Sequence, residues 1–155
     1  ISYHYFNKTS SIEYLHKSII LLEKQKQYHL LATPFYNMAV THTEMGNYKK
    51  AFSAFQRSIQ YDKRKAIIGL PFLYRCLEYE PSLRYDHDLT KLLVDAKPYY
   101  DQVVPCVQLV YDFYEAKANH QYEKIMEELL PRFYRYQNEI KYNAFYFSIV
   151  FYHLS

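Results

Sequence analysis

Glycine is almost absent from this chain: its 155 residues include 2 glycines, 2 cysteines and no tryptophan. Sandwich and α/β folds depend on many tight turns, where glycine is favoured, so this scarcity argues against both classes. Hydrophobic residues instead recur at helical spacing along most of the chain. The sequence therefore predicts an all-α protein, and its length suits a single domain with one core.

The chain is also poor in features of secreted and membrane proteins. Cys76 and Cys106 lie inside helical patterns and form no CxxC pair, which predicts buried, reduced thiols. No stretch of the given sequence has the pattern of a secretory signal, and no apolar run reaches the ~20 residues of a membrane span. We therefore expect a cytoplasmic protein with no membrane contact.

Patterns that carry catalysis or bind metals are scarce as well. Asp86-His87-Asp88 is the best metal candidate, but adjacent residues point apart and no second ligand cluster accompanies it. Asp88 is better interpreted as a helix cap. Neither cysteine has a neighbouring histidine, and the chain contains no P-loop or GxGxxG motif. We expect no catalytic residues, no metal and no cofactor.

Charge gives little evidence for nucleic-acid binding. The net charge is +3, and the basic excess is concentrated in residues 1–66, with ten Lys/Arg against four Asp/Glu. The run Lys63-Arg64-Lys65 fits a solvated turn, because cations are favourable at a helix C-terminus. We expect no direct nucleic-acid contact from this segment.

The clearest positive pattern is a helix hairpin over residues 35–63. Small and apolar residues recur three or four apart in two runs: Phe35, Met38, Ala39 and His42, then Ala51, Phe55, Ser58 and Ile59. Gly46 ends the first helix, since glycine accepts the left-handed conformation found there, and Asn47 caps the second. The pattern predicts two antiparallel helices with Ala39 and Ala51 facing each other near the turn.

This hairpin resembles the tetratricopeptide repeat (TPR). The resemblance is carried by Phe35, Asn37-Met38-Ala39, His42, Gly46, Tyr48, Ala51, Phe55 and Ser58. The departures are phenylalanine for the usual tryptophan, histidine for a tyrosine, Ser58 for the last alanine and Lys63 for the closing proline. Because such hairpins normally stack in arrays, the resemblance implies a right-handed superhelix of stacked antiparallel helix hairpins, a TPR-like α-solenoid.

Weaker copies are expected on both sides, within a single TPR-like domain that is a fragment of a longer protein. The hairpins would span approximately residues 1–27, 29–63, 64–97 and 99–137, with a half-hairpin at 139–155. In the first, a new helix would start at Thr9 or Ser10. We also expect Pro71 to bend the first helix of the third hairpin, Pro105 to interrupt the first helix of the fourth, and Pro131 to kink the second helix of the fourth.

The resemblance also implies a binding groove, because the first helix of each hairpin lines the concave face. The groove positions carried onto this chain are Tyr36, Asn37, Val40 and Glu44; Tyr74, Arg75 and Glu78; Val107, Val110, Tyr111 and Tyr114; and Asn143. Asn37 is the sharpest candidate, since an amide donates and accepts hydrogen bonds with a peptide backbone. Arg75 would pair with a peptide carboxylate.

The long, tyrosine-rich hairpins are similar in texture to the peptide-sensing regulators of Gram-positive bacteria, the Rap, NprR, PlcR and Rgg type. That similarity implies the sensor part of a transcriptional or signalling regulator, which binds a short imported peptide as in quorum sensing. Two alternatives stay open. One is a constitutive TPR scaffold that holds a protein partner, and the other is a homodimer formed through the apolar last helix.

Overall fold

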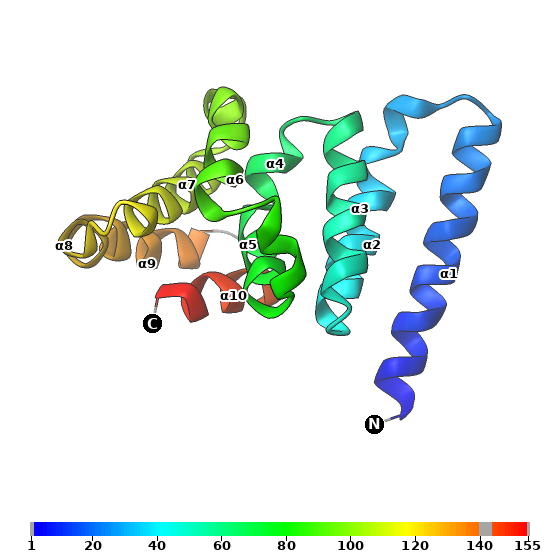
Figure 1. The fold of residues 1–155 in the computed structure, drawn as a ribbon, viewed down its shortest axis with the longest axis horizontal. Helices are drawn as coiled ribbons and strands as arrows, with labels where there is room; N and C mark the ends of the chain where they lie inside the picture. The colour runs from blue at the N-terminus through cyan, green and yellow to red at the C-terminus, as the bar shows by residue number, and fades with distance from the viewer. Residues whose placement is uncertain (1, 140–143, 155) are drawn as a thin grey trace.

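The computed structural model describes residues 2–139 and 144–154, and every regular element in these ranges is a helix (Figure 1). The all-α prediction is confirmed. The longer helices are α1 (Ser2–Lys24), α2 (Ala32–Glu44), α3 (Tyr48–Tyr61), α5 (Leu70–Tyr79), α6 (Leu89–Ala96), α7 (Pro105–Ala118), α9 (Leu130–Glu139) and α10 (Ala144–Leu154). Short helical segments connect them: η1 (Tyr28–Leu30), α4 (Lys65–Ile68), η2 (Pro81–Tyr85), η3 (Lys97–Gln102), α8 (Tyr122–Lys124) and the π-helical η4 (Ile125–Leu129).

Successive helices pack side by side along most of the chain. α1 lies on α2, α2 on α3, α3 on α5, α5 on α6, and α6 on α7, which in turn contacts α9. Helix α10 departs from this order, because it returns to lie against α5, as Figure 1 shows. Aromatic rings fill much of the core, and Phe55, Phe72, Phe113 and Tyr114 are the largest fully buried side chains.

The α2–α3 hairpin matches the predicted one closely. Gly46 adopts the expected left-handed conformation, with φ of +77°, and Ala39 and Ala51 are both fully buried. Asn47 occupies the N-cap position of α3, but its side chain makes no capping hydrogen bond. The hairpin is closed instead by the Ser58 hydroxyl, which donates to the Ala32 carbonyl over 2.6 Å.

The predicted helix start at Thr9 or Ser10 is wrong. Helix α1 runs without a break from Ser2 to Lys24, so residues 1–27 do not form a hairpin in the part the structure describes. The segment contains neither glycine nor proline, so no residue in it forces the backbone out of the helix. Serine and threonine favour helix starts but are also tolerated within a helix.

The prolines start helices rather than interrupting them. The predicted helix over residues 64–79 is divided at Gly69 into α4 and α5, and Pro71 lies in the first turn of α5. Pro105 is the first residue of α7. Proline suits these positions, because the first N–H groups of a helix have no intrahelical acceptor. Pro131 lies in the first turn of α9, directly after the π-helical η4. The helix over residues 122–139 is therefore irregular just before Pro131, where a kink was predicted.

Candidate functional site

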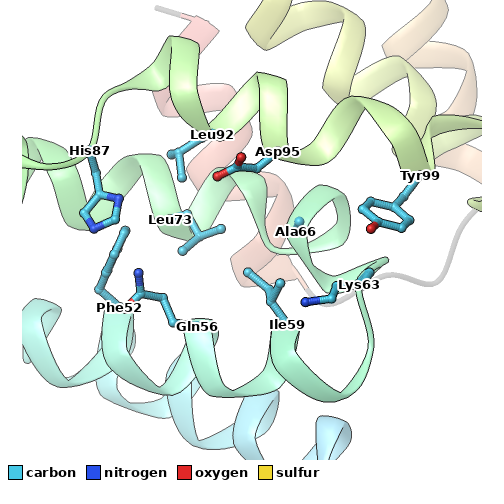
Figure 2. Close-up of a pocket in the computed structure, with 10 residues that line it drawn as sticks. All are labelled: Phe52, Gln56, Ile59, Lys63, Ala66, Leu73, His87, Leu92, Asp95 and Tyr99. Carbon is cyan, nitrogen blue, oxygen red and sulfur yellow. The ribbon is translucent and has the colours of Figure 1, made fainter.

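A hollow lies between α3, α5 and α6, and Figure 2 shows the residues around it. Its volume is about 380 Å³, within the range of about 300–1,000 Å³ typical of ligand pockets. The lining residues are Phe52, Gln56, Ile59, Lys63, Ala66, Leu73, His87, Leu92, Asp95 and Tyr99.

The floor of this hollow is apolar. Phe52, Ala66, Leu73 and Leu92 are each buried in the core, and Ile59 packs half-buried beside them. Helix α3 presents this face because positions 52, 56 and 59 are one and two turns apart. The floor can therefore accept an apolar side chain with little rearrangement.

The rim is polar and charged. Gln56, Lys63 and Asp95 are exposed, and they contribute an amide and one charge of each sign. Figure 2 shows His87 and Phe52 at one end of the hollow and Lys63 and Tyr99 at the other. The His87 ring packs on Phe52 with centroids 4.7 Å apart.

A second hollow of about 330 Å³ adjoins the first, and His87 lines both. Its other lining residues are Tyr74, Leu77, Glu78, Arg84, Asp88 and Leu89. The Arg84 guanidinium donates to the carbonyls of Leu77 and Glu78 and so caps the end of α5. Asp88 caps α6 as predicted, accepting the Lys91 N–H over 2.7 Å.

The predicted groove residues of α2 lie away from these hollows. Asn37 is exposed, and Val40 is half-buried. The Tyr36 ring packs edge-on against Phe55 at 5.6 Å, while Glu44 pairs with Lys8 of α1 over 3.3 Å. Helical spacing brings these side chains to neighbouring positions on α2, and peptide contact with them remains a prediction.

The predicted groove residues of the fourth hairpin are largely buried, although Tyr111 also lines a hollow of about 300 Å³ with Tyr100 and Asp112. Val107, Val110, Tyr111 and Tyr114 are all buried. Helix α7 packs against both α6 and α9, and most of its apolar residues belong to the core. The resemblance placed these residues by position in a repeat, which carries no information about what covers them.

The predicted groove residues of the third hairpin are brought together with α10. His153 of α10 is buried, and its Nε2 lies 2.8 Å from a carboxylate oxygen of Glu78. The Nδ1 of the same ring lies 2.6 Å from the Tyr114 hydroxyl. The Tyr74 ring packs edge-on against His153 at 4.8 Å.

The charges around His153 keep it neutral. Burial, with the positive charges of Lys117 and Arg75, lowers the pKa of His153 to about 3. Burial also raises the pKa of Glu78. Burial is the largest cause of both shifts, since it disfavours the charged form of each group. Sequence spacing gave no sign of this cluster, since Glu78 and His153 are far apart in the chain. The predicted groove residue Asn143 lies outside the described residues.

Other chemistry is sparse in the part of the chain that the structure describes. No group of three or more His, Cys, Asp and Glu side chains there is placed to hold a metal ion. No described helix has the length and apolar character needed to cross a membrane. Cys76 and Cys106 are buried as predicted, and burial raises the pKa of the Cys76 thiol to about 12.

Comparison with known proteins found no matching protein-family model, no matching curated protein and no matching solved structure. The hollow between α3 and α6 was missed at the sequence level, although one signal was present. Phe52, Gln56 and Ile59 recur three and four apart on α3, so they share a face that overlaps the predicted stripe only at Ile59.

Proposed function

We propose that this chain is a helical-repeat module that binds a short peptide or an extended segment of a partner protein. The observation that carries the proposal is the hollow between α3, α5 and α6, which combines an apolar floor with a polar rim. Pockets of this composition bind ligands by burying apolar groups and fixing their orientation with a few polar contacts.

The rim suits a peptide more than a purely apolar ligand. The Gln56 amide can donate to and accept from a peptide backbone whatever side chains the peptide carries. Lys63 and Asp95 provide opposite charges near the buried floor, so they would favour one direction of the bound segment. An apolar side chain flanked by polar backbone groups is the expected bound element.

In the cell, the module would be the cytoplasmic sensor part of a bacterial transcriptional or signalling regulator, with TPR-like hairpins arranged in a right-handed superhelix. The support for this finer proposal is the repeat pattern of residues 35–63 and the observed α2–α3 hairpin. A ligand wedged between α3 and α6 would change how neighbouring hairpins pack, which is how a sensor biases an output domain.

Calorimetric titration with a library of short peptides tests the proposal. We expect micromolar binding of a specific sequence, weakened by about 0.5–1.5 kcal/mol in Gln56→Ala, because a hydrogen bond to the peptide is lost. Gln60→Ala is the matched control, since Gln60 is exposed on the same helix but does not line the hollow. Asn37→Ala, measured in parallel, tests the predicted groove on α2.

Two results would count against a peptide site in this hollow. One is the absence of saturable binding by any peptide. The other is equal weakening by Gln56→Ala and Gln60→Ala, which would mean that the loss is unrelated to the hollow. A loss of affinity confined to Asn37→Ala would move the site to α2.

A constitutive scaffold is the second candidate, and a different surface favours it. Helix α1 and η1 expose several large apolar side chains, among them Tyr14, Ile20, Leu21, Tyr28 and Leu30. Where exposed apolar side chains form a contiguous patch, they mark surfaces that bind proteins. If α1 is a permanent interface, Ile20→Lys should abolish capture of a folded partner, or dissociate a homodimer in light scattering, while leaving peptide affinity unchanged.

A further inference from the structure

The hollow between α3, α5 and α6 continues past His87. The ring of His87 lies at one end of this first hollow (Figure 2) and also lines the second hollow, of about 330 Å³. On α5, Leu73 lines the first hollow and Leu77 the second. On α6, Leu92 lines the first hollow and Leu89 the second. The same pair of helices therefore provides apolar surface to both hollows.

The offset between the hollows matches the repeat of an extended peptide. The two leucines on each helix are three or four residues apart, which is about 4.5–6 Å along a helix axis. In an extended chain, alternate side chains point to the same face and are about 6.5–7 Å apart. A segment that places one side chain in the first hollow can therefore place the side chain two residues away in the second.

The second hollow is more acidic than the first. Glu78 and Asp88 line it with two carboxylates, and Arg84 contributes one guanidinium. That guanidinium is already engaged, because its Nε and Nη2 donate to two carbonyls near the end of α5 over 2.6 and 2.7 Å. In the described part of the chain, one Glu78 oxygen faces the His153 ring and one Asp88 oxygen accepts a backbone N–H of α6. The other oxygen of each carboxylate can accept from a ligand.

A lysine or arginine side chain fits this combination of surfaces. Leu77, Leu89 and the Tyr74 ring line the hollow with apolar atoms, on which the aliphatic stem of such a side chain can lie. Its charged end would then reach the Glu78 and Asp88 carboxylates, and charge-assisted hydrogen bonds of this kind are stronger than neutral ones.

The half-buried Glu78 carboxylate also favours a cationic ligand. Burial raises its pKa, even though the positive charges of Lys117, Arg75 and Arg84 act in the opposite direction. The ionised form is therefore less stable than it would be in water, and a ligand cation would offset part of that loss. Of the three cations, only Arg84 lines the hollow.

We propose that the two hollows form one groove for an extended segment with an apolar side chain in the first hollow and a lysine or arginine, two residues away, in the second. Either order of the two side chains along the segment satisfies this spacing. The assignment rests on the proposed peptide-binding function and names its ligand class.

Fluorescence polarisation with short labelled glycine–serine peptides, capped at both ends, tests this specificity. The probes contain Leu-Ser-Lys or Lys-Ser-Leu, and norleucine or glutamate replaces lysine in the matched peptides. The better lysine peptide should bind about fivefold more tightly than its norleucine counterpart, which keeps the stem without the charge, and the glutamate peptide should bind most weakly. A peptide with lysine directly beside leucine is the spacing control, and it should lose the advantage over norleucine.

Glu78→Gln locates the preference, because it removes the charge and keeps the size of the side chain. The advantage of lysine over norleucine should fall to about twofold or less. Asp86→Asn is the matched control, since Asp86 is exposed in the loop before α6 and lines neither hollow. If circular dichroism shows that Glu78→Gln is unfolded, Asp88→Asn replaces it, because asparagine also caps a helix.

Three results would overturn the assignment while leaving the proposed function standing. They are binding of the leucine peptides without a preference for lysine, an equal preference in the spacing control, and a preference that survives both Glu78→Gln and Asp88→Asn. Binding of none of these peptides would overturn the assignment too. The proposed function would then be decided by the peptide library, which requires no basic residue.

Discussion

Ser58 and His153 are polar side chains that the fold removes from water. Each is retained because it has a specific partner: the Ala32 carbonyl for Ser58, and Glu78 with Tyr114 for His153. A buried polar group without a partner would cost stability, so these pairings are part of what specifies the fold.

Replacing Ser58 by alanine should lower the free energy of unfolding by about 1 kcal/mol, because a hydrogen bond between α3 and the start of α2 is lost. Urea denaturation monitored by circular dichroism measures this. Ser53→Ala is the matched control, since Ser53 is exposed on the same helix, and it should change the free energy of unfolding very little. A stability of Ser58→Ala equal to or above wild type would show that the hydroxyl is dispensable. Alanine, the usual residue at this position of the TPR pattern, would then be at least as stable there as serine.

Acid should weaken the fold through His153. Its pKa is lowered from 6.5 to about 3 in the folded chain, so below pH 6.5 the unfolded chain takes up a proton that the folded chain does not. The stability due to neutral His153 is therefore complete above the unfolded pKa and is lost as the pH falls toward the folded one. Burial raises the pKa of Glu78, so protonation of this carboxyl as the pH falls acts in the opposite direction.

Between about pH 7.5 and about pH 5.5, the free energy of unfolding should fall by about 1 kcal/mol more in wild type than in His153→Phe. The comparison with the variant matters because the pKa of His42 is also lowered, chiefly by burial, and contributes to both proteins alike. The same pH dependence in wild type and variant would mean that His153 titrates as an ordinary exposed histidine.

At the scale of helices, local chemistry predicted the hairpin but not every break. Gly46 was predictable because only a residue tolerant of positive φ fits the turn there. Gly69, which divides α4 from α5, was not, because its role depends on packing. A Cβ at this position would lie 2.9 Å from the Lys65 carbonyl oxygen and 3.4 Å from the Phe55 ring. The ring comes from another helix, α3, so no local pattern reveals it.

Gly69→Ala should therefore destabilise the protein by about 1–3 kcal/mol, as overpacking does in a close-packed interior. The loss should be partly recovered in Gly69→Ala/Phe55→Leu, which makes room beside the new methyl group; a double-mutant cycle in urea measures that coupling. Purely additive effects would place the strain in the backbone near Lys65 rather than at the Phe55 ring.

At the scale of the whole molecule, the class of fold was predictable and the candidate site was not. Composition and spacing indicate helices, because each helix carries its own periodic pattern. The hollow between α3 and α6, and the packing of α10 against α5, depend on which faces meet in space. Phe52 and His87 form one wall through the packing of α3 against the loop before α6, and Glu78 meets His153 only because α10 returns to α5.

The most direct test of the proposed function is chemical-shift mapping of the ¹⁵N-labelled chain with the tightest peptide from the library. If the hollow between α3, α5 and α6 is the binding site, saturable shifts will concentrate at Phe52, Gln56, Ile59 and Asp95, and will be weakened in Gln56→Ala but not in Gln60→Ala. Shifts confined to Asn37 and its neighbours on α2, or no saturable shifts at all, would contradict the assignment of this hollow as the peptide site.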